Sequence, residues 1–412
     1  MTNLRTIARK SLGLARLSWP AWREMIRDRR GVPAADPGPE RAIDEALEWL
    51  GRAQDRSRSQ DGGVARDFSL IKGWNASYPE TTGYIVPTFL ACARLKKDDS
   101  LRERARRMLD WLVSIQFPEG GFQGGVIGET PVVPVTFNTG QILMGLAAGV
   151  RELGDAYRDP MRRAADWLAN SLDPDGCWRK HPTPFAAPGE KAYETHVSWG
   201  LLEAARVEPN PAWSDAALRN VRWALSHQRD NGWFARCCLE REPAPLTHTL
   251  GYVLRGVLEA YRFAKEADLL AAARRTGDGL LSALRDDGFL PGRLDSSWQG
   301  AVPSACLTGS VQVAHCWLIL YQETGEARYR DGAFAANAFV RRTLAVGGDE
   351  NMRGGVKGSF PVDGDYGTFQ YLNWAAKFLI DSQLLELRVR GEEGSRPGAG
   401  QGADDGITTG RR

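Results

Sequence analysis

The chain lacks the features on which small disulfide-rich or membrane-spanning proteins depend. It has only six cysteines in 412 residues, and no CxxC pair or metal-finger spacing occurs among them, so neither a disulfide framework nor a zinc finger is predicted. No apolar run reaches the roughly 18 residues that a membrane-spanning helix needs. We expect a protein with reduced thiols in the cytoplasm, with no metal or cofactor assigned from sequence.

The chain also lacks an excess of charge of either sign. Lysine and arginine number 53 and the acidic residues 51, which leaves a formal net charge of +2. A charge this small predicts no nucleic-acid partner. Strand signals are scarce as well, while hydrophobic residues make up 42% of the chain. The composition therefore indicates a soluble protein with a large core, and the fold class expected is all-α.

What the sequence does contain is an internal repeat. Trp111, Trp167 and Trp223 stand 56 residues apart. Each is followed nine residues later by a glycine, and Gly288 continues the glycine series. A period near fifty residues indicates one structural unit used several times.

Two kinds of helical pattern alternate through this repeat. Amphipathic stretches with a charged face are expected in an outer layer, and stretches that are apolar nearly all round are expected to be buried on every side. Several of the buried stretches start near a Thr-Gly pair, such as Thr139-Gly140, where the hydroxyl is predicted to accept hydrogen bonds from free helix amides. The outer set covers about 40–54, 101–116, 157–171, 212–228, 265–284 and 325–345, and the buried set 80–95, 136–153, 193–206, 246–264, 306–323 and 370–386.

Six exposed helices that alternate with six buried ones predict six helical hairpins closed into a ring. The pattern resembles the (α/α)6 toroids, which include six-hairpin glycosidases, unsaturated glucuronyl hydrolases, polysaccharide lyases, uronyl epimerases and sugar 2-epimerases. The Gln … Gly-aromatic turns also resemble the repeats of squalene cyclases and protein prenyltransferases. We expect the toroid to occupy residues 37–388, between an N-terminal extension (1–36) and a disordered Gly-rich tail (389–412).

The N-terminal extension is basic and amphipathic. Residues 1–30 carry eight arginines and lysines among interspersed Leu, Ile and Trp residues. Such a helix packs on the protein body or lies on an anionic membrane surface. Peripheral membrane contact through residues 1–30 therefore stays an open interpretation.

The loops and first turns before the inner helices collect the unusual polar residues. In a closed ring these segments border one central cavity, where aromatic rings stack on sugar faces and polar groups bind hydroxyls. Acid–base chemistry on a glycan needs a proton donor and a base that converge there. The catalytic candidates are Glu80, Glu194, His196, His248, Asp363 and Asp365, and the substrate-binding candidates are Tyr78, Asn138, Tyr193, Trp199, Tyr252, Gln312, Arg353, Lys357, Tyr366, Asn373 and Trp374.

Several candidates also have a purely structural explanation. Glu80 follows Pro79 at a helix start, where a carboxylate stabilises the positive helix end. Asp363-Gly364-Asp365 is compatible with a simple turn. His315, in the middle of an apolar run, is predicted to be a hydrogen-bonded core residue.

The function expected is acid–base chemistry on a polar or uronic-acid-containing glycan. Hydrolase, lyase and epimerase remain open, because the carboxylates suit the first and Tyr or His bases suit the others. The alternatives are an isoprenoid cyclase or prenyltransferase, although the cyclase DxDD string is absent, and a non-catalytic toroid that binds glycan or protein during polysaccharide assembly.

Overall fold

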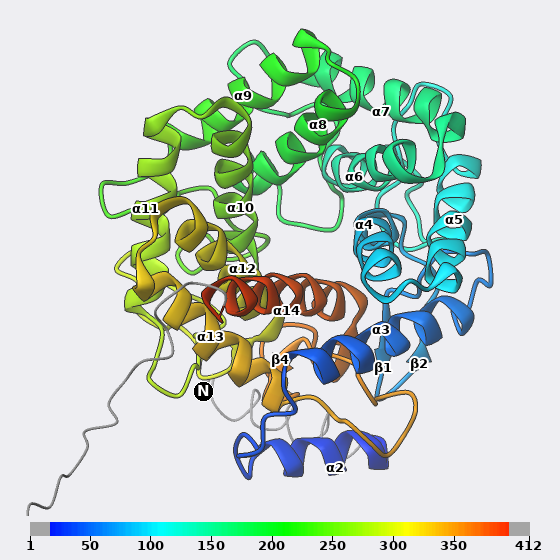
Figure 1. The fold of residues 1–412 in the computed structure, drawn as a ribbon. Helices are drawn as coiled ribbons and strands as arrows, with labels where there is room; N and C mark the ends of the chain where they lie inside the picture. Colours follow the sequence, from blue (N-terminus) through cyan, green and yellow to red (C-terminus); the bar gives the residue numbers. More distant parts are fainter. Residues whose placement is uncertain (1–16, 395–412) are drawn as a thin grey trace, which may run out of the picture.

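The computed structural model describes residues 17–394, and these form a double ring of helices (Figure 1). The expected all-α toroid is confirmed. The inner ring consists of α4 (Pro79–Lys96), α6 (Thr136–Leu153), α8 (Thr195–Val207), α10 (Thr247–Ala264), α12 (Leu307–Thr324) and α14 (Asn373–Gly394). The outer ring consists of α3 (Pro39–Asp55), α5 (Asp99–Ser114), α7 (Arg158–Ser171), α9 (Pro211–Leu225), α11 (Ala267–Ser282) and α13 (Ala327–Arg342).

The inner ring is closed by contacts between its first and last members. Each inner helix packs against the next one, and α14 packs against α4. The outer helix α3 packs on α14 rather than on α4, the inner helix that follows it in the chain. The first outer helix and the last inner helix therefore pack as a pair, like the two helices of a hairpin, although they come from opposite ends of the sequence (Figure 1).

Glycine allows the inner helices to approach each other closely. A Cβ at Gly145 in α6 would overlap the carbonyl oxygen of Gly83 in α4, and a Cβ at Gly200 in α8 would overlap that of Gly140 in α6. These contacts explain why the inner helices are rich in small residues. A side chain at either position would separate two neighbouring inner helices and widen the ring.

The threonine hydroxyls near the inner-helix starts have a different role from the one predicted. Thr82 and Thr139 each accept a hydrogen bond from a loop amide, that of Val64 and that of Phe122, both at 3.0 Å. Each also donates to a carbonyl four residues earlier in its own chain. The hydroxyls therefore attach the preceding loop to the inner helix instead of capping the amides of their own helix.

The glycine series that revealed the repeat marks the turns from outer helix to loop. Gly120, Gly176, Gly232 and Gly288 have φ of +109°, +93°, +85° and +85°. A Cβ at each would collide with the backbone of the next outer helix. Positive φ and close backbone approach both favour glycine here, so the repeat is a packing requirement between neighbouring hairpins.

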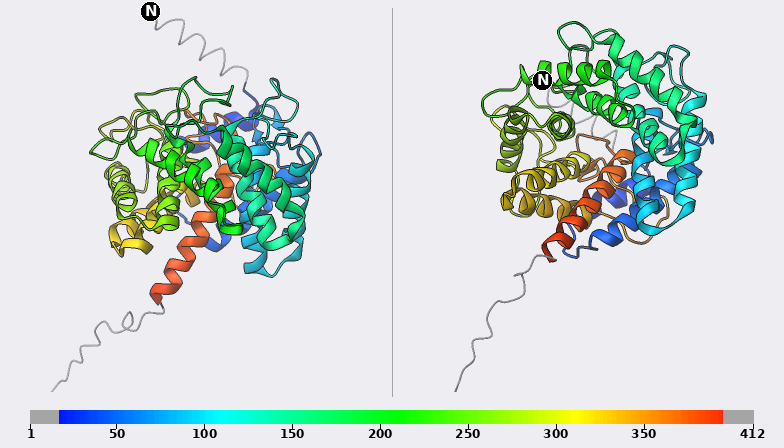
Figure 2. Two further views of the ribbon diagram at one scale, coloured as in Figure 1. Left: turned by 90° about the horizontal axis from the view of Figure 1, so that it is seen from above. Right: turned by 45° about the horizontal axis from the view of Figure 1, so that its top comes forward.

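Short strands tie the loops together on one side of the ring. β1 (Asp67–Ser69) pairs antiparallel with β2 (Gly73–Trp74) and with β5 (Gln370–Leu372), in the order β2-β1-β5. β3 (Ala305–Cys306) pairs with β4 (Ser359–Phe360). Two single turns of 3-10 helix, η1 (Asp155–Tyr157) and η2 (Ala192–Glu194), precede α7 and α8. Figure 2 shows the long loops on one side of the ring and the end of α14 on the other.

The N-terminal segment packs on the body where the structure describes it. Helix α2 (Trp19–Asp28) buries Glu24 and Asp28 against Lys357, whose Nζ lies 3.1 Å and 2.5 Å from their carboxylates. Residues 1–16 of the extension expected over 1–36 lie outside the described part of the chain. At the other end α14 runs to Gly394, so the tail expected over 389–412 overlaps this helix, and residues 395–412 also lie outside the described part.

Candidate active site

A cavity of about 550 Å³ lies at the N-terminal ends of the inner helices, on the side of the ring where the loops that precede these helices lie. Loops and helix starts that are distant in the sequence contribute to its wall. The polar lining includes Arg66, Asn75, Glu80, Glu129, Asn138, Glu240, His248, Arg293, Asp365 and Gln370, and the aromatic lining Tyr78, Tyr84, Phe137, Phe185, Tyr193, Tyr252, Tyr366 and Trp374.

Glu80 is the buried carboxyl group of this wall. It lies in the first turn of α4, and the Tyr78 hydroxyl donates a hydrogen bond of 2.5 Å to its Oε2. Burial raises the pKa of Glu80 to about 7, although the Tyr78 hydrogen bond and the charge of Arg66 act in the opposite direction. A carboxyl group with this pKa carries a proton part of the time at neutral pH, as a general acid must.

Asp365 is a second carboxylate of the cavity, and it is paired with arginine. The guanidinium of Arg293, which is buried, donates through Nε to Asp365 Oδ2, and Arg241 lies 3.8 Å from the other oxygen. Two arginines thus lie within ion-pair distance of this carboxylate. The same cavity therefore combines a buried carboxyl group whose pKa is raised with a second carboxylate that is paired with arginine.

His248 contributes a neutral imidazole. Its Nδ1 lies 2.6 Å from the carbonyl oxygen of the Gln312 side chain, so with this amide orientation Nδ1 carries the hydrogen and Nε2 has the free lone pair. Burial lowers the pKa of His248 to about 4, while the Gln312 hydrogen bond acts in the opposite direction. His248 is thus uncharged at neutral pH and able to act as a base.

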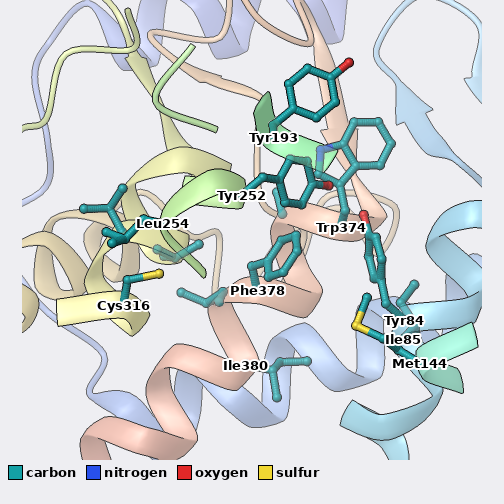
Figure 3. Close-up of a cluster of buried hydrophobic side chains, with 14 of the residues drawn as sticks. Tyr84, Ile85, Met144, Tyr193, Tyr252, Leu254, Cys316, Trp374, Phe378 and Ile380 are labelled. Carbon is teal, nitrogen blue, oxygen red and sulfur yellow. The ribbon is translucent and has the colours of Figure 1, made fainter. Parts of the chain in front are cut away.

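Aromatic rings surround these groups. The His248 ring lies 4.4 Å from Tyr252 and 5.3 Å from Tyr366, centroid to centroid. Trp374 Nε1 donates a 3.0 Å hydrogen bond to the Tyr366 hydroxyl. Figure 3 shows Tyr252 and Trp374 together between the helices, with Phe378 below them on the side away from Tyr193. Such rings suit the apolar faces of a sugar.

Several cavity residues were missed at the sequence level. Arg66 lies 5.3 Å above the Trp374 ring and 2.7 Å from Asp67, and it precedes the short strand β1 rather than an inner helix. Arg293 likewise belongs to a loop without an unusual local pattern. No signal in the sequence marked either arginine, because only the tertiary fold brings these loops to the rim. Phe137, in contrast, stands beside the predicted Asn138 in the first turn of α6.

Glu194 and His196 are buried near the cavity but do not line it. Glu194 is 6% exposed, its Oε2 has no hydrogen-bond partner within the described residues, and burial raises its pKa to about 8, opposed by Lys191. His196 Nδ1 lies 2.6 Å from the side-chain oxygen of Gln141, and its ring packs against Tyr252 and Trp199. Both belong to the wall behind the cavity.

Three candidates are placed elsewhere, so their expected position in the cavity was wrong. Asp363 forms an ion pair of 2.9 Å with Arg29 after α2. Arg353 pairs with Glu45 and Glu48 of α3. Lys357 is buried against α2, as described above. Each has a local partner of opposite charge, and sequence alone could not show that such a partner lay nearby.

Three other candidates also lie outside this cavity, where two form structural hydrogen bonds and one lines a second cavity. Gln312 fixes His248, and Asn373 donates to the Ala65 carbonyl and the Thr81 hydroxyl at 2.9 Å and 2.8 Å. Trp199 lines a second cavity on the opposite side of the ring. The predicted residues that do line the loop-side cavity are Tyr78, Glu80, Asn138, Tyr193, His248, Tyr252, Asp365, Tyr366 and Trp374.

Within residues 17–394 no group of three or more histidine, cysteine or acidic side chains is arranged to hold a metal ion. Among the same residues no helix is both long and apolar enough to cross a membrane. The six cysteines are all free and buried.

Comparison with solved structures identifies the architecture. An unsaturated glucuronyl hydrolase specific for heparin aligns with a TM-score of 0.69 at 15% identity, over 86% of this chain and 98% of the other. The fold is the six-hairpin (α/α)6 toroid. A D-mannose isomerase aligns with a TM-score of 0.68 at 11% identity, over 87% and 100% of the two chains. A sugar epimerase from a ruminal bacterium aligns with a TM-score of 0.69 at 12% identity, over 85% and 97%.

At these identities the similarity establishes the fold alone. No protein-family model matches the chain, and no curated protein matches its sequence. The additional resemblance to cyclase and prenyltransferase repeats stays a prediction.

Proposed function

We propose that this protein is a carbohydrate-active enzyme that hydrolyses a glycosidic bond in its loop-side cavity. The observation that carries the proposal is the pair of carboxyl groups in one cavity, Glu80 with a pKa of about 7 and Asp365 held by Arg293. Glycoside hydrolysis uses two carboxyl groups with different protonation states. The hydrolase, isomerase and epimerase structures described above support a sugar substrate for this toroid.

In this mechanism Glu80 gives its proton to the oxygen of the leaving sugar. Asp365 accepts a proton from the attacking water, so that one proton leaves the pair and one returns. The Tyr78 hydroxyl, which donates to Glu80, and Arg293, which donates to Asp365, keep the two groups in position. Preorganised partners of this kind lower the barrier because they need no rearrangement during the reaction.

The cavity chemistry supports a polar or uronic-acid-containing substrate. Arg66 lines the wall beside Trp374, where an aromatic face and a guanidinium meet. A sugar stacked on Trp374 would present a carboxylate to Arg66, and arginine binds carboxylates through two parallel hydrogen bonds. The amide Nδ2 of Asn138 is buried without a partner among the described residues, and it is a donor for a sugar hydroxyl.

The proposal is tested by activity on a panel of acidic and neutral oligosaccharides, measured as new reducing ends. We expect Glu80→Gln and Asp365→Asn each to lower kcat by about 10²–10⁴-fold, the usual contribution of an acid or base. Asp363→Asn is the matched control, because it changes the same residue type in the same loop outside the cavity. Retained hydrolysis in both cavity variants would remove the assigned roles. Glycan binding without turnover would favour a toroid that only binds glycans.

A second candidate, a sugar isomerase or epimerase, is favoured by the free Nε2 of His248. A neutral imidazole at this position is able to remove the proton from the carbon next to a carbonyl, and the imidazolium that forms is able to return the proton to the sugar. In this reaction His248→Asn would abolish activity, while Asp365→Asn would retain it. Incorporation of deuterium from D₂O into unreacted and converted sugar, followed by NMR, distinguishes this chemistry from hydrolysis.

We also propose that the N-terminal segment contacts an anionic membrane surface and that the protein works in the cytoplasm. On α2, Trp19 is 75% exposed and Ile26 48% exposed, and Arg23 lies between them on the same helix face. Tryptophan, isoleucine and arginine together suit the boundary of an anionic bilayer. Free, buried cysteines support a reducing compartment.

Co-sedimentation with phosphatidylserine vesicles tests the membrane contact. We expect the wild type to bind these vesicles and the double variant Trp19→Ala, Arg23→Ala to bind them more weakly. Neutral phosphatidylcholine vesicles should not be bound. Equal binding to both lipids, or no binding to either, would contradict it.

A further inference from the structure

A second cavity lies across the ring from the candidate active site. It measures about 270 Å³, and all six inner helices contribute to it through residues beyond their first turn. Tyr84 lines both cavities. Figure 2 shows this side of the ring as the one from which α14 projects. None of the groups assigned to acid–base chemistry lines this second cavity.

The lining of this cavity is strongly basic. It contains five cationic side chains, Arg151, Arg255, Arg262, Lys377 and Arg388, but only the two carboxylates Glu203 and Asp381. The chain as a whole is close to balance between basic and acidic residues, with a net charge of +2. The excess of positive charge is therefore a local feature of this cavity.

The carboxylates nearby compensate these cations only in part. Glu203 pairs with Arg151 at 2.6 Å, and Asp381 pairs with Lys377 at 2.7 Å. Both of these carboxylates line the cavity themselves, so each offsets one cation of the wall. The other three arginines of the lining, Arg255, Arg262 and Arg388, have no carboxylate partner within the lining.

The remaining arginines have few partners of their own. Arg255 and Arg262 share the carboxylate of Glu259, at 2.9 Å and 3.3 Å, and Arg262 also lies 3.7 Å from Glu323, which pairs with Lys265 as well. Glu259 also lies 3.7 Å from Arg206 and is buried behind the cavity wall. Arg388 forms no ion pair within residues 17–394. The cavity therefore retains positive charge after its ion pairs are taken into account.

Helix electrostatics do not explain this arrangement. Arg151 and Arg262 lie in the last turns of α6 and α10, where a cation stabilises the negative end of a helix. Arg255, however, lies in the middle of α10, and Lys377 lies near the start of α14, where the helix end is positive. A buried lysine at that position is unfavourable unless a negative group offsets it, and Asp381 is its one carboxylate partner in the described structure.

Two further side chains suit recognition of a ligand. The Arg255 guanidinium stacks 4.0 Å above the Trp199 ring and donates through Nε to Glu259, which leaves its two Nη groups for hydrogen bonds in the plane. His315 was expected to be a hydrogen-bonded core residue, but it lines the cavity, and its ring forms no hydrogen bond within residues 17–394. Burial and then the charges of Arg255, Lys377, Arg262 and Arg388 lower the pKa of His315 well below its ordinary value.

We propose that this second cavity binds a small oxyanion, a phosphate or carboxylate group on a low-molecular-weight ligand, through Arg255, Lys377 and Arg388. Guanidinium groups match the geometry of both anions, and a cavity of about 270 Å³ holds one such group with a small attached body. The site is separate from the sugar chemistry proposed above and does not depend on it.

Titration calorimetry at low ionic strength, with pyrophosphate and with glucuronate as probes, tests the proposal. We expect at least one probe to bind the wild type, with affinity reduced at least tenfold in Arg255→Gln and at least threefold in the exposed Arg388→Glu. Arg219→Glu on outer helix α9 makes the same charge change away from the cavity and is expected to bind as wild type. Glu80→Gln is also expected to bind normally, which separates this site from the active-site cavity.

A preference between the probes identifies the ligand chemistry, since pyrophosphate reports a phosphate site and glucuronate a carboxylate site. NMR titration of the histidines gives a second readout. A bound anion would offset the nearby cations and raise the pKa of His315, while that of His181 outside this cavity would stay unchanged. Binding of neither probe, or binding equally strong in Arg255→Gln and Arg388→Glu as in wild type, would overturn the proposal even where the hydrolase activity is confirmed.

Discussion

At the scale of single residues, burial decides the chemistry of the candidate site. Glu80 and Glu194 are both acidic residues just before or within the first turn of an inner helix, and burial raises the pKa of each, to about 7 and about 8. Only Glu80 lines the cavity. Burial therefore makes Glu80 a candidate general acid, whereas at Glu194 it only makes the ionised carboxylate costly for the stability of the fold.

The pKa of Glu80 predicts how activity depends on pH. The proposed acid must be protonated, and its proton is lost as the pH rises through about 7. We expect kcat/KM for hydrolysis to fall about tenfold per pH unit above that value. Asp363→Asn should leave the profile unchanged. A rate that stays constant up to about pH 9, two units above the pKa, would contradict the assignment of Glu80 as the acid.

The pKa of Glu194 predicts how stability depends on pH. Its folded-state pKa is above the ordinary value of 4.5, so the folded protein holds this proton more tightly than the unfolded chain. The stabilising effect is complete below pH 4.5 and is lost as the pH rises toward 8, at about 1.4 kcal/mol per pH unit in between. Urea unfolding at about pH 5 and about pH 8.5 should show a smaller loss of stability for Glu194→Gln than for wild type.

At the scale of helices, glycine sets the spacing of the inner ring. Gly145 of α6 contacts the backbone of Gly83 in α4, with no space for a methyl group. The inner helices are consequently held at backbone-to-backbone distance, and the cavity wall inherits that geometry. The outer helices present charged side chains to the solvent instead, so their outward faces carry no such requirement.

Gly145→Ala is expected to destabilise the protein by about 1–3 kcal/mol, since the added methyl group overlaps a carbonyl of the neighbouring helix. Gly391→Ala in α14 is the matched control, because a Cβ there meets no atom within 4 Å. That control should be neutral or stabilise by up to about 1 kcal/mol, as alanine favours helix more than glycine does. Thermal unfolding followed by circular dichroism measures both, and equal effects would contradict the packing argument.

At the scale of the whole molecule, contacts between the chain ends close the structure. The outer helix α3 packs on α14, and α2 supplies both carboxylates that surround the buried Nζ of Lys357. The loop that contains Lys357 continues to Asp365 in the cavity. The N-terminal helix therefore supports the wall of the candidate site, in addition to its proposed membrane contact.

Removal of residues 1–30 takes away α2 and both carboxylate partners of Lys357 while it keeps Asp36 for Arg341, and it is expected to cost up to about 3–5 kcal/mol. A second substitution, Lys357→Met, in the truncated protein should recover part of this loss. In the full-length chain the same substitution should instead destabilise, because it leaves Glu24 and Asp28 unpaired. Denaturant unfolding of the four proteins forms a double-mutant cycle, and additive effects would contradict the ion-pair explanation.

The sequence by itself determined the ring. Three features of the sequence indicate it: the 56-residue period, the alternation of amphipathic and wholly apolar helices, and the glycines at turns with positive φ. All three depend on local geometry and on burial, which leave a periodic pattern in the order of residues. Tyr78, Glu80 and His248 could be predicted for the same reason, since they lie at helix starts that any closed ring directs to its centre.

Only the tertiary structure decided which polar residues share the cavity. Arg66 and Arg293 reach it from loops without a distinguishing pattern, whereas Lys357 and Asp363 pair with the N-terminal segment. The basic cavity across the ring likewise assembles from six helices far apart in the chain. Ion pairs and desolvation depend on distances across the whole fold, and those distances leave no periodic trace in the sequence.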